Sequence, residues 1–217
     1  LGMDGSDSEL LRVGYPLVVL GERIFGGPAD HVTMQNVEAA RAATEHLLAL
    51  GRRRIAVIGA HQGEVIGSAG LRLRGYRQAL AAAGIPFDPH LVVHSDAWFR
   101  ADGARVMAEF LSTGLPFDAV FAFNDTLALG AMRVLQEAGL RIPEDVAVIG
   151  FDDLDDAKYS LPTLTTVNPG RDEIAQTAVE ILLDRISGAP ATAPAREIQS
   201  QFEIVHREST GGTAIFA

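Results

Sequence analysis

Four side chains of the types that bind polyhydroxy ligands each follow or flank a predicted strand: Arg72, Trp98, Asn124 and Asp152. An arginine donates to two oxygens in a fixed geometry, and a carboxylate accepts hydrogen bonds from two adjacent hydroxyls. Trp98, the only tryptophan, offers a flat apolar face to the C–H side of a sugar ring. The set predicts non-covalent binding of a small polar molecule.

Each of these side chains also has a purely structural interpretation. Arg72 could be a surface helix residue paired with a nearby acid, and Trp98 could be half-exposed packing. Asn124 could cap the helix that follows it, which would not exclude a ligand contact. The run Asp152–Asp156 could be a solvated acidic loop or a cation site, but it lacks the glycine and the spacing of a calcium-binding loop, so we expect no metal.

The region around Asn124 and Asp152 has the pattern strand, helix, strand. Asp118–Phe123 is a short apolar run, Thr126–Ala138 carries helix formers, and Val146–Phe151 is a second apolar run. The short return between them predicts parallel strands joined by a right-handed crossover. Asn124 and Asp152 should then lie at the carboxyl ends of neighbouring strands, where open α/β sheets bind ligands.

The alternation of strands and helices extends along the chain from Tyr15. Further strands are expected at Leu17–Leu20, Ile55–Ile58, Leu91–His94 and between Arg196 and Val205, and further helices at Ala39–Leu50, Leu73–Ala83, Asp102–Ser112 and Asp172–Ser187. Arg72 would open the second of these helices. The pattern is typical of an α/β fold with a parallel, doubly wound sheet. The first fourteen residues predict only one weak helical turn.

Composition limits the class of protein. The 217 residues are 47% apolar, contain no cysteine and carry a net charge of −10. The lack of cysteine excludes disulfides and thiolate metal sites and fits a reducing cytoplasm. No apolar run approaches the roughly 20 residues of a membrane span. The acidic charge argues against nucleic-acid binding by this segment alone, and the basic cluster Arg52–Arg54 is interpreted as a solvated helix C-terminus.

Catalytic and cofactor motifs find little support. Gly59–Gly70 (GAHQGEVIGSAG) is glycine-rich, but it lacks the Gly-Lys-Ser/Thr ending of a phosphate-binding loop and the spacing of a dinucleotide fingerprint. The sequence has no G-x-S-x-G or H-E-x-x-H motif, and its six histidines are scattered. We therefore expect no enzymatic activity and no cofactor.

Three motifs occur in order between Asn124 and Val167: ND-x-x-A-x-G-A, I-P-x-D-V-x-V-x-G-F-D-D and P-x-L-T-T-V. With HLLALGRRRIAVIG (46–59), LRLRGYRQAL (71–80) and EIVHREST (203–210), they make the sequence from about Tyr15 to Thr210 resemble the effector-binding core of the LacI/GalR family. The resemblance implies a periplasmic-binding-protein-like type I fold with two doubly wound, parallel-sheet lobes.

The resemblance also implies a division of the chain. Residues 1–33 and 170–201 would form part of the N-terminal lobe, and residues 34–169 and 202–217 the C-terminal lobe. The chain would cross between lobes near Thr33–Asn36, Val167–Gly170 and Gln201–Glu203. In the family, a helix-turn-helix DNA-binding headpiece and two further βα units come first, so we expect this sequence to be a fragment with an incomplete N-terminal lobe.

The function that the resemblance implies is ligand sensing and dimerisation in a transcriptional regulator. The implied partners are a small polar effector such as a sugar, a second copy of the chain, and operator DNA bound through the headpiece absent from this chain. The family positions that line the effector pocket correspond here to Arg72, Trp98, Asn124 and Asp152, and Ser68 could add a hydroxyl contact. Gly21 stands where sugar-responsive members often have an acid, which removes one expected hydroxyl acceptor.

The helix Thr126–Gln136 presents Leu127, Ala128, Ala131 and Leu135 at helical spacing, more than one narrow core stripe requires. We take this as a sign of self-association, although core packing would explain it as well. Two other functions stay open: a secreted type I sugar-binding protein of a transporter, and an enzyme that uses the same cleft. A helix-turn-helix pattern upstream would favour the regulator over the transporter.

Overall fold

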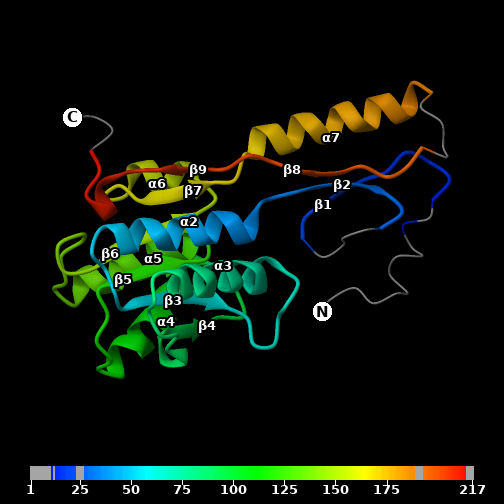
Figure 1. Cartoon of the computed structure of the whole chain (residues 1–217). Coiled ribbons are helices and arrows are strands. Elements are labelled where there is room, and N and C mark those ends of the chain that lie inside the picture. The colour runs from blue at the N-terminus through cyan, green and yellow to red at the C-terminus, as the bar shows by residue number, and fades with distance from the viewer. Residues whose placement is uncertain (1–10, 12, 23–26, 189–192, 214–217) are drawn as a thin grey trace.

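The computed structural model describes residues 11, 13–22, 27–188 and 193–213. The strands in these ranges form two sheets, which lie side by side in Figure 1. One has three strands in the order β1-β2-β8, and the other has six in the order β4-β3-β5-β6-β7-β9. The helical turn predicted near the N-terminus falls mostly on residues 1–10 and 12, which lie outside the described residues.

The smaller sheet is parallel and is packed by the long helix α7 (Arg171–Ile186). Its strands are β1 (Val18–Leu20), β2 (Asp30–Thr33) and β8 (Glu197–Gln199). The sequence did not predict β2, because its residues are mostly polar although all four are buried. The buried carboxylate of Asp30 accepts two hydrogen bonds from the guanidinium of Arg185, at 2.7 and 2.8 Å, and this pairing makes burial of the acid possible.

The larger sheet confirms the predicted parallel, doubly wound architecture. Its parallel strands are β3 (Ile55–Ala60), β4 (Val92–His94), β5 (Ala119–Ala122), β6 (Ala147–Phe151) and β7 (Thr165–Asn168). The edge strand β9 (Glu203–Val205) is antiparallel to β7. The single run of strand predicted from Arg196 to Val205 is therefore two strands, β8 and β9, which belong to different sheets.

Helices cover both faces of the larger sheet. α2 (Asn36–Ala49) and α3 (Ser68–Ala82) pack on one face, and α4 (Arg100–Ser112) and α5 (Asp125–Glu137) pack on the other. Alternate residues of each buried strand point to opposite faces, so one core takes alternate residues of β3, β5 and β6 and the other core takes those between them. Short helices complete the chain at η1 (Pro89–Leu91), α6 (Asp155–Tyr159) and η2 (Glu208–Thr210).

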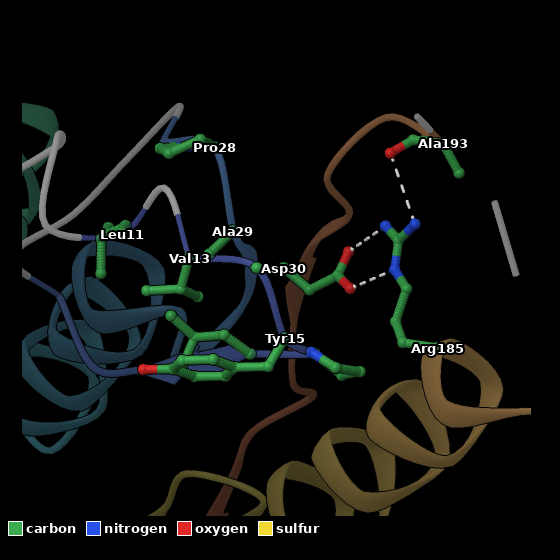
Figure 2. Close-up of a pocket in the computed structure, with 11 residues that line it drawn as sticks. Leu11, Val13, Tyr15, Pro28, Ala29, Asp30, Arg185 and Ala193 are labelled. Atoms are coloured by element: carbon green, nitrogen blue, oxygen red, sulfur yellow. Dashed lines mark hydrogen bonds and ion pairs between the residues drawn. The ribbon is translucent and has the colours of Figure 1, made fainter. Parts of the chain in front are cut away.

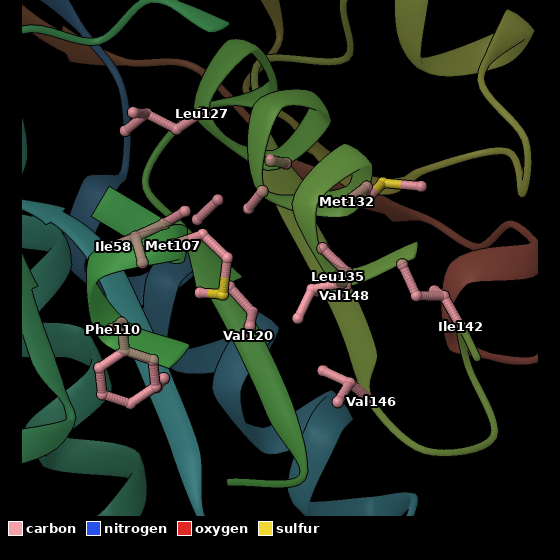
Figure 3. Packing of buried hydrophobic residues seen from close by; sticks show 14 of the residues in the cluster. Ile58, Met107, Phe110, Val120, Leu127, Met132, Leu135, Ile142, Val146 and Val148 are labelled. Atoms are coloured by element: carbon pink, nitrogen blue, oxygen red, sulfur yellow. The ribbon is translucent and has the colours of Figure 1, made fainter. Parts of the chain in front are cut away.

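Figure 3 shows the core under α4 and α5, where Met107 and Phe110 face Val120 of β5. All four apolar residues of α5 on which we based self-association, Leu127, Ala128, Ala131 and Leu135, are completely buried in this core. They pack against β5, β6 and α4 and cannot meet a second copy. That basis for self-association was wrong, and the alternative of core packing is confirmed.

The helix α3 begins at Ser68, five residues before the start that the sequence suggested. The Glu64 side chain explains the difference: its Oε1 accepts hydrogen bonds from the backbone N–H groups of Ala69 and Gly70, at 3.0 and 3.3 Å. A carboxylate at this place satisfies N–H groups that the first turn of a helix leaves free. Arg72 therefore lies within the second turn of α3 and does not open the helix.

The chain passes between the two sheets three times, between β2 and α2, between β7 and α7, and between β8 and β9. Figure 1 shows these segments running next to one another between the two sheets. The larger sheet with α2 to α6 thus forms one packed unit, which is connected to the smaller sheet by three segments of the chain.

Candidate functional site

The predicted site residues lie at the carboxyl ends of the central strands of the larger sheet. Asn124 follows β5, Asp152 follows β6, and Trp98 lies between β4 and α4. Strand β3 pairs with the later strands β4 and β5 on its two sides, so the strand order reverses there. Open α/β sheets bind ligands beyond the strand ends at such a reversal. The topology therefore brings the predicted residues to the place where a ligand site is expected.

Arg72 is the centre of the cluster and is only 2% exposed. Its Nε donates to Oδ1 of Asn36 at 2.8 Å, and its Nη1 donates to the carbonyl of Phe123. Its Nη2 lies 3.7 Å from Oδ1 of Asp152, and the guanidinium carbon lies 3.5 Å from the centre of the Phe151 ring. The interpretation of Arg72 as a surface helix residue was wrong, because the side chain is enclosed on every side by these partners.

Burial dominates the electrostatics of this pair. Burial raises the pKa of Asp152 to about 6, while the charges of Arg72 and Arg171 act in the opposite direction. Burial also lowers the pKa of Arg72, against the charges of Asp152, Glu22 and Asp125. A titratable group in a cleft whose pKa is shifted by desolvation and by a specific partner is a common feature of functional sites.

The backbone holds Asp152 in a conformation that side chains rarely adopt. Asp152 has a φ of 111° and Asp153 a φ of 49°. A positive φ of this kind costs on the order of 1–3 kcal/mol for each non-glycine residue. The surrounding contacts hold this turn in place: the N–H of Asp152 donates to the carbonyl of Val167 at 2.8 Å, and Oδ1 of Asp153 lies 2.6 Å from Nη2 of Arg207. The turn places the two carboxylates differently, with Asp153 bound to Arg207 and Asp152 beside Arg72.

Trp98 lies across the end of β3. Its Nε1 donates to the carbonyl of Gly59 at 2.9 Å, so the indole N–H is used within the protein and the ring face is what a ligand can contact. Gly59 has a φ of +100° at an irregularity of the strand, and a Cβ there would lie 2.6 Å from Leu127 and 3.2 Å from the indole nitrogen. The Arg72 guanidinium and the His61 ring each lie 5.4 Å from the indole ring.

Asn124 caps α5, as its structural interpretation predicted. Its Oδ1 accepts from the N–H of Leu127 at 2.9 Å, and its Nδ2 donates to the carbonyl of Trp98 at 3.2 Å. The side chain is 9% exposed and fixes the segment that carries Trp98 against the end of β5. A ligand contact by Asn124 stays a prediction.

Ser68 reaches the site through a residue that sequence reasoning did not select. Its Oγ donates to Oε2 of Glu22 at 2.8 Å, although the two residues are 46 positions apart. The Glu22 charge acts on both Arg72 and Asp152. Glu22, the residue next to Gly21, thus brings a carboxylate to the cluster, and only its position beside Gly21 could have indicated it.

A second carboxylate, that of Asp125, lies buried next to Asp152. Its Oδ1 accepts from Oγ1 of Thr166 at 2.6 Å, and its Oδ2 accepts from the N–H of Leu154 at 2.8 Å. Burial raises the pKa of Asp125 to about 7, assisted by the negative charges of Asp152 and Asp153 and opposed by the two hydrogen bonds. Asp125 joins α5 to the turn after β6 and so supports the position of Asp152.

A cavity of about 280 Å³ lies away from this cluster, where residues 11 and 13–17 and residues 28–30 meet the end of α7. Figure 2 shows it lined by apolar side chains such as Val13 and Tyr15, with Asp30 and Arg185 at one side. The charged groups of those two residues bind one another. The cavity thus lacks the converging polar groups that orient a polar ligand, and we place the site at the strand ends instead.

The described ranges hold neither a metal cluster nor a membrane-spanning helix. No group of three or more His, Cys, Asp or Glu residues there is arranged to hold a metal ion. In the same part of the chain, no helix has both the length and the apolar character needed to cross a membrane. The acids after Asp152 have individual partners, as with Asp156, whose carboxylate lies 2.5 Å from Arg100.

The likeness to known proteins extends over most of the chain. A model of the periplasmic binding protein-like domain matches residues 44–210. The chain is 55% identical to a LacI-family protein of known structure from Sanguibacter keddieii, with a TM-score of 0.88 and coverage of 92% of this chain and 75% of that one. It is 31% identical to a LacI-family transcriptional regulator from Enterococcus faecium, solved with bound ribose, with a TM-score of 0.80 over 92% of this chain and 72% of that one.

Among curated relatives, the HTH-type transcriptional regulator CelR of Thermobifida fusca is 40% identical over 188 residues, which is 85% of this chain and 54% of CelR. The chain spans about half the length of the curated relatives it matches. These relatives are regulators of transcription, which confirms the prediction that the chain is not an enzyme and does not favour the transporter alternative. The chain therefore belongs to the LacI family of transcriptional regulators and carries the periplasmic-binding-protein-like domain with which that family senses effectors.

Proposed function

We propose that this chain is the ligand-sensing part of a transcriptional regulator and that its effector, a sugar or a related polar metabolite, binds where Arg72, Trp98 and Asp152 meet. The observation that carries the proposal is the contact of these three side chains at the reversal of strand order. Relatives add support, because the Enterococcus faecium regulator contains bound ribose and a CelR structure similar to this chain is a complex with cellobiose.

The chemistry of the cluster suits a hydroxylated ring. Asp152 is the partly exposed member of the ion pair, with 27% of its side chain exposed against 3% for Arg72. Its carboxylate can accept from adjacent hydroxyls while Arg72 holds it in place. The half-buried face of Trp98 provides the apolar contact that the C–H side of a sugar ring requires.

Effector binding would control the parent protein by changing how its two lobes are oriented. Glu22 follows a strand of the smaller sheet, whereas Ser68 and Arg72 belong to the unit built on the larger sheet, so the cluster lies where the two units touch. A ligand that binds one relative orientation better shifts the population toward it. Such coupling typically changes the affinity at a second site by about 5–150-fold.

We further propose that the parent protein is a homodimer. Three large apolar side chains near the start of α4 and the end of α6 are strongly exposed: Phe99 (71%), Tyr159 (68%) and Leu161 (82%). The segments that carry them are held together by the ion pair of Arg100 with Asp156 and by a hydrogen bond from Gln136 to the Leu161 carbonyl. An apolar surface of this kind is typical of protein–protein contacts, and a twofold operator calls for a twofold protein.

Operator binding would belong to the headpiece of the longer protein, in the cytoplasm. The net charge of −10 disfavours contact between this chain and duplex DNA. The basic cluster Arg52–Arg54 is engaged within the protein, since the three guanidinium groups donate to the backbone carbonyls of Pro143, Leu48 and Pro116, respectively.

The test is operator retention by the longer polypeptide that joins this chain to its headpiece. In a mobility-shift assay, a sugar or nucleoside that the chain binds should change operator affinity at least fivefold. The Asp152→Asn variant should retain the operator but lose the response to the ligand. The 217-residue chain alone should retain no operator at about 50 mM salt, where a true binder holds DNA tightly. Operator affinity that ignores every bound ligand would contradict the proposal.

A further inference from the structure

Three polar atoms around Arg72 and Trp98 are buried and have no hydrogen-bond partner among the described residues: Oε1 of Glu22, Nδ2 of Asn36 and Nε2 of His61. They belong to one connected group. Asn36 accepts from Arg72, the Glu22 charge acts on Arg72, and the His61 ring lies 5.4 Å from the ring of Trp98. A buried polar atom without a partner is unfavourable because it has lost its hydrogen bonds to water, so three of them in one cluster point to a ligand that would satisfy them.

The second atom of each side chain fixes what the unpartnered atom can do. Oε2 of Glu22 already accepts from Ser68, so Oε1 remains as a second acceptor. Nδ1 of His61 lies 2.7 Å from Oε2 of Glu64, which places a proton on Nδ1, so that in the neutral form of the ring Nε2 is the acceptor. Oδ1 of Asn36 accepts from Nε of Arg72 at 2.8 Å, so its Nδ2 is the donor that remains.

We propose that Glu22 and His61 are specificity-determining residues, which accept hydroxyl hydrogens of the effector and select an uncharged, hydroxyl-rich ligand over a phosphorylated one. The proposal rests on the function proposed above and defines its substrate class. Two acceptors and one donor around an aromatic face match vicinal hydroxyls and a ring or ether oxygen. They do not match a phosphate, which has only acceptor oxygens when it is ionised.

The charges of the cluster also favour an uncharged ligand over a phosphorylated one. Glu22, Glu64 and Asp152 are carboxylates, whereas the cation in contact with the cluster, Arg72, already donates to Asn36 and to the Phe123 carbonyl and pairs with Asp152. Arg171 also acts on Asp152, but its Nη2 donates to the carbonyl of Asp153. Within the part of the chain that the structure describes, a phosphate dianion would therefore meet several carboxylates and no free arginine fork, and like charges brought together discriminate strongly against a ligand.

Access to the three atoms requires movement. All three are closed to solvent, and Glu22 lies on Ser68 across the junction of the two units. A ligand that uses Oε1 of Glu22 must enter as Glu22 separates from Ser68. Binding at Glu22 would then couple occupancy of the site to the relative position of the units, as the proposed function demands.

Calorimetric titration of the 217-residue chain with matched pairs tests the inference: ribose and its phosphate ester, cellobiose and its phosphate ester, adenosine and its monophosphate. The neutral member of at least one pair should bind the wild type, and its ester should bind at least tenfold more weakly. Glu22→Gln should weaken binding of the neutral ligand about tenfold and reduce the ratio between the affinities for the neutral ligand and for its ester. His61→Phe keeps a ring against Trp98 but removes the acceptor, and should weaken the same ligand severalfold.

The exposed acid of α4 provides a matched control, since Glu109→Gln should leave all affinities unchanged. An ester that binds as tightly as its neutral partner would overturn the inference, and so would unchanged affinities in both Glu22→Gln and His61→Phe. In either case, binding of the neutral compound to the wild type would still support the proposed function. Failure of the wild type to bind any of the compounds would overturn the proposed function itself. The comparison within the wild type needs no substitution and does not depend on how the variants fold.

Discussion

Replacing Asp125 with asparagine should remove a large pH dependence from the stability of this domain. The carboxyl group is completely buried between α5 and the turn after β6, and burial raises its pKa from 3.8 to about 7. Between these two values the folded chain holds a proton on Asp125 that the unfolded chain has released. The contribution is therefore fully present at low pH and is lost as pH rises through about 7.

The magnitude follows from the shift. Each pKa unit corresponds to about 1.4 kcal/mol, so a shift of about three units makes the wild type about 4 kcal/mol less stable above pH 7 than near pH 4 through this residue alone. Asparagine stays neutral throughout. It can also keep both hydrogen bonds, because its Oδ1 can accept from the N–H of Leu154 and its Nδ2 can donate to the hydroxyl of Thr166.

The assay is urea unfolding followed by the fluorescence of Trp98, the only tryptophan, at several pH values from about 5 to about 8. Asp152 titrates in the same range, so the informative quantity is the difference in unfolding free energy between Asp125→Asn and the wild type. It should grow in favour of the variant by about 1.4 kcal/mol per pH unit and level off above pH 7. The exposed residue Asp96 gives the control, and Asp96→Asn should follow the wild type. Parallel curves for Asp125→Asn and the wild type would refute the reasoning.

Two further predictions concern packing and assembly. Gly150→Ala should destabilise the domain by about 1–3 kcal/mol in the same unfolding assay, because the added Cβ would lie 2.1 Å from Oδ1 of Asp125. Gly14→Ala is the control, because its Cβ would meet no atom within 4 Å. Equal losses of unfolding free energy in the two variants would contradict the packing argument. Sedimentation at tens of micromolar should show a dimer that Leu161→Asp weakens and that Val65→Asp, at another strongly exposed position, does not weaken. A wild type that is monomeric at every concentration would count against the proposed contact for this chain.

The elements of the larger sheet were predictable because local sequence determines them strongly. β5 and β6 are continuous apolar runs, and both end at polar residues. β2 was missed because its burial depends on partners distant in sequence: the Asp30 carboxylate is buried against Arg185 and Arg196, which are 155 and 166 positions away. The start of α3 was misplaced for a related reason, since the side chain of Glu64 lies outside the helix yet satisfies its first N–H groups.

The candidate site divides in the same way. Arg72, Trp98 and Asp152 could be selected because each follows or flanks a strand of a recognisable pattern. Glu22 and His61 could not, because nothing in their local sequence places them beside these residues. Glu22 reaches the cluster from the end of β1 in the smaller sheet, and His61 is oriented by a hydrogen bond to Glu64 in the loop between β3 and α3. Tertiary packing brings such residues together, and the periodicity of the sequence does not indicate which distant residues will meet.

The most direct measurement is the affinity of a neutral sugar or nucleoside for this chain, compared by calorimetry with its affinity for Asp152→Asn and Arg72→Lys. Asparagine tolerates the positive φ of Asp152 and removes only the charge, and lysine keeps the charge of Arg72 without its two-pronged geometry. Each variant should bind the ligand about 2–3 kcal/mol more weakly than the wild type, the scale of a lost charge-assisted hydrogen bond, while Glu109→Gln binds it unchanged. A ligand that binds the wild type and both site variants with equal affinity would show that the effector site lies elsewhere.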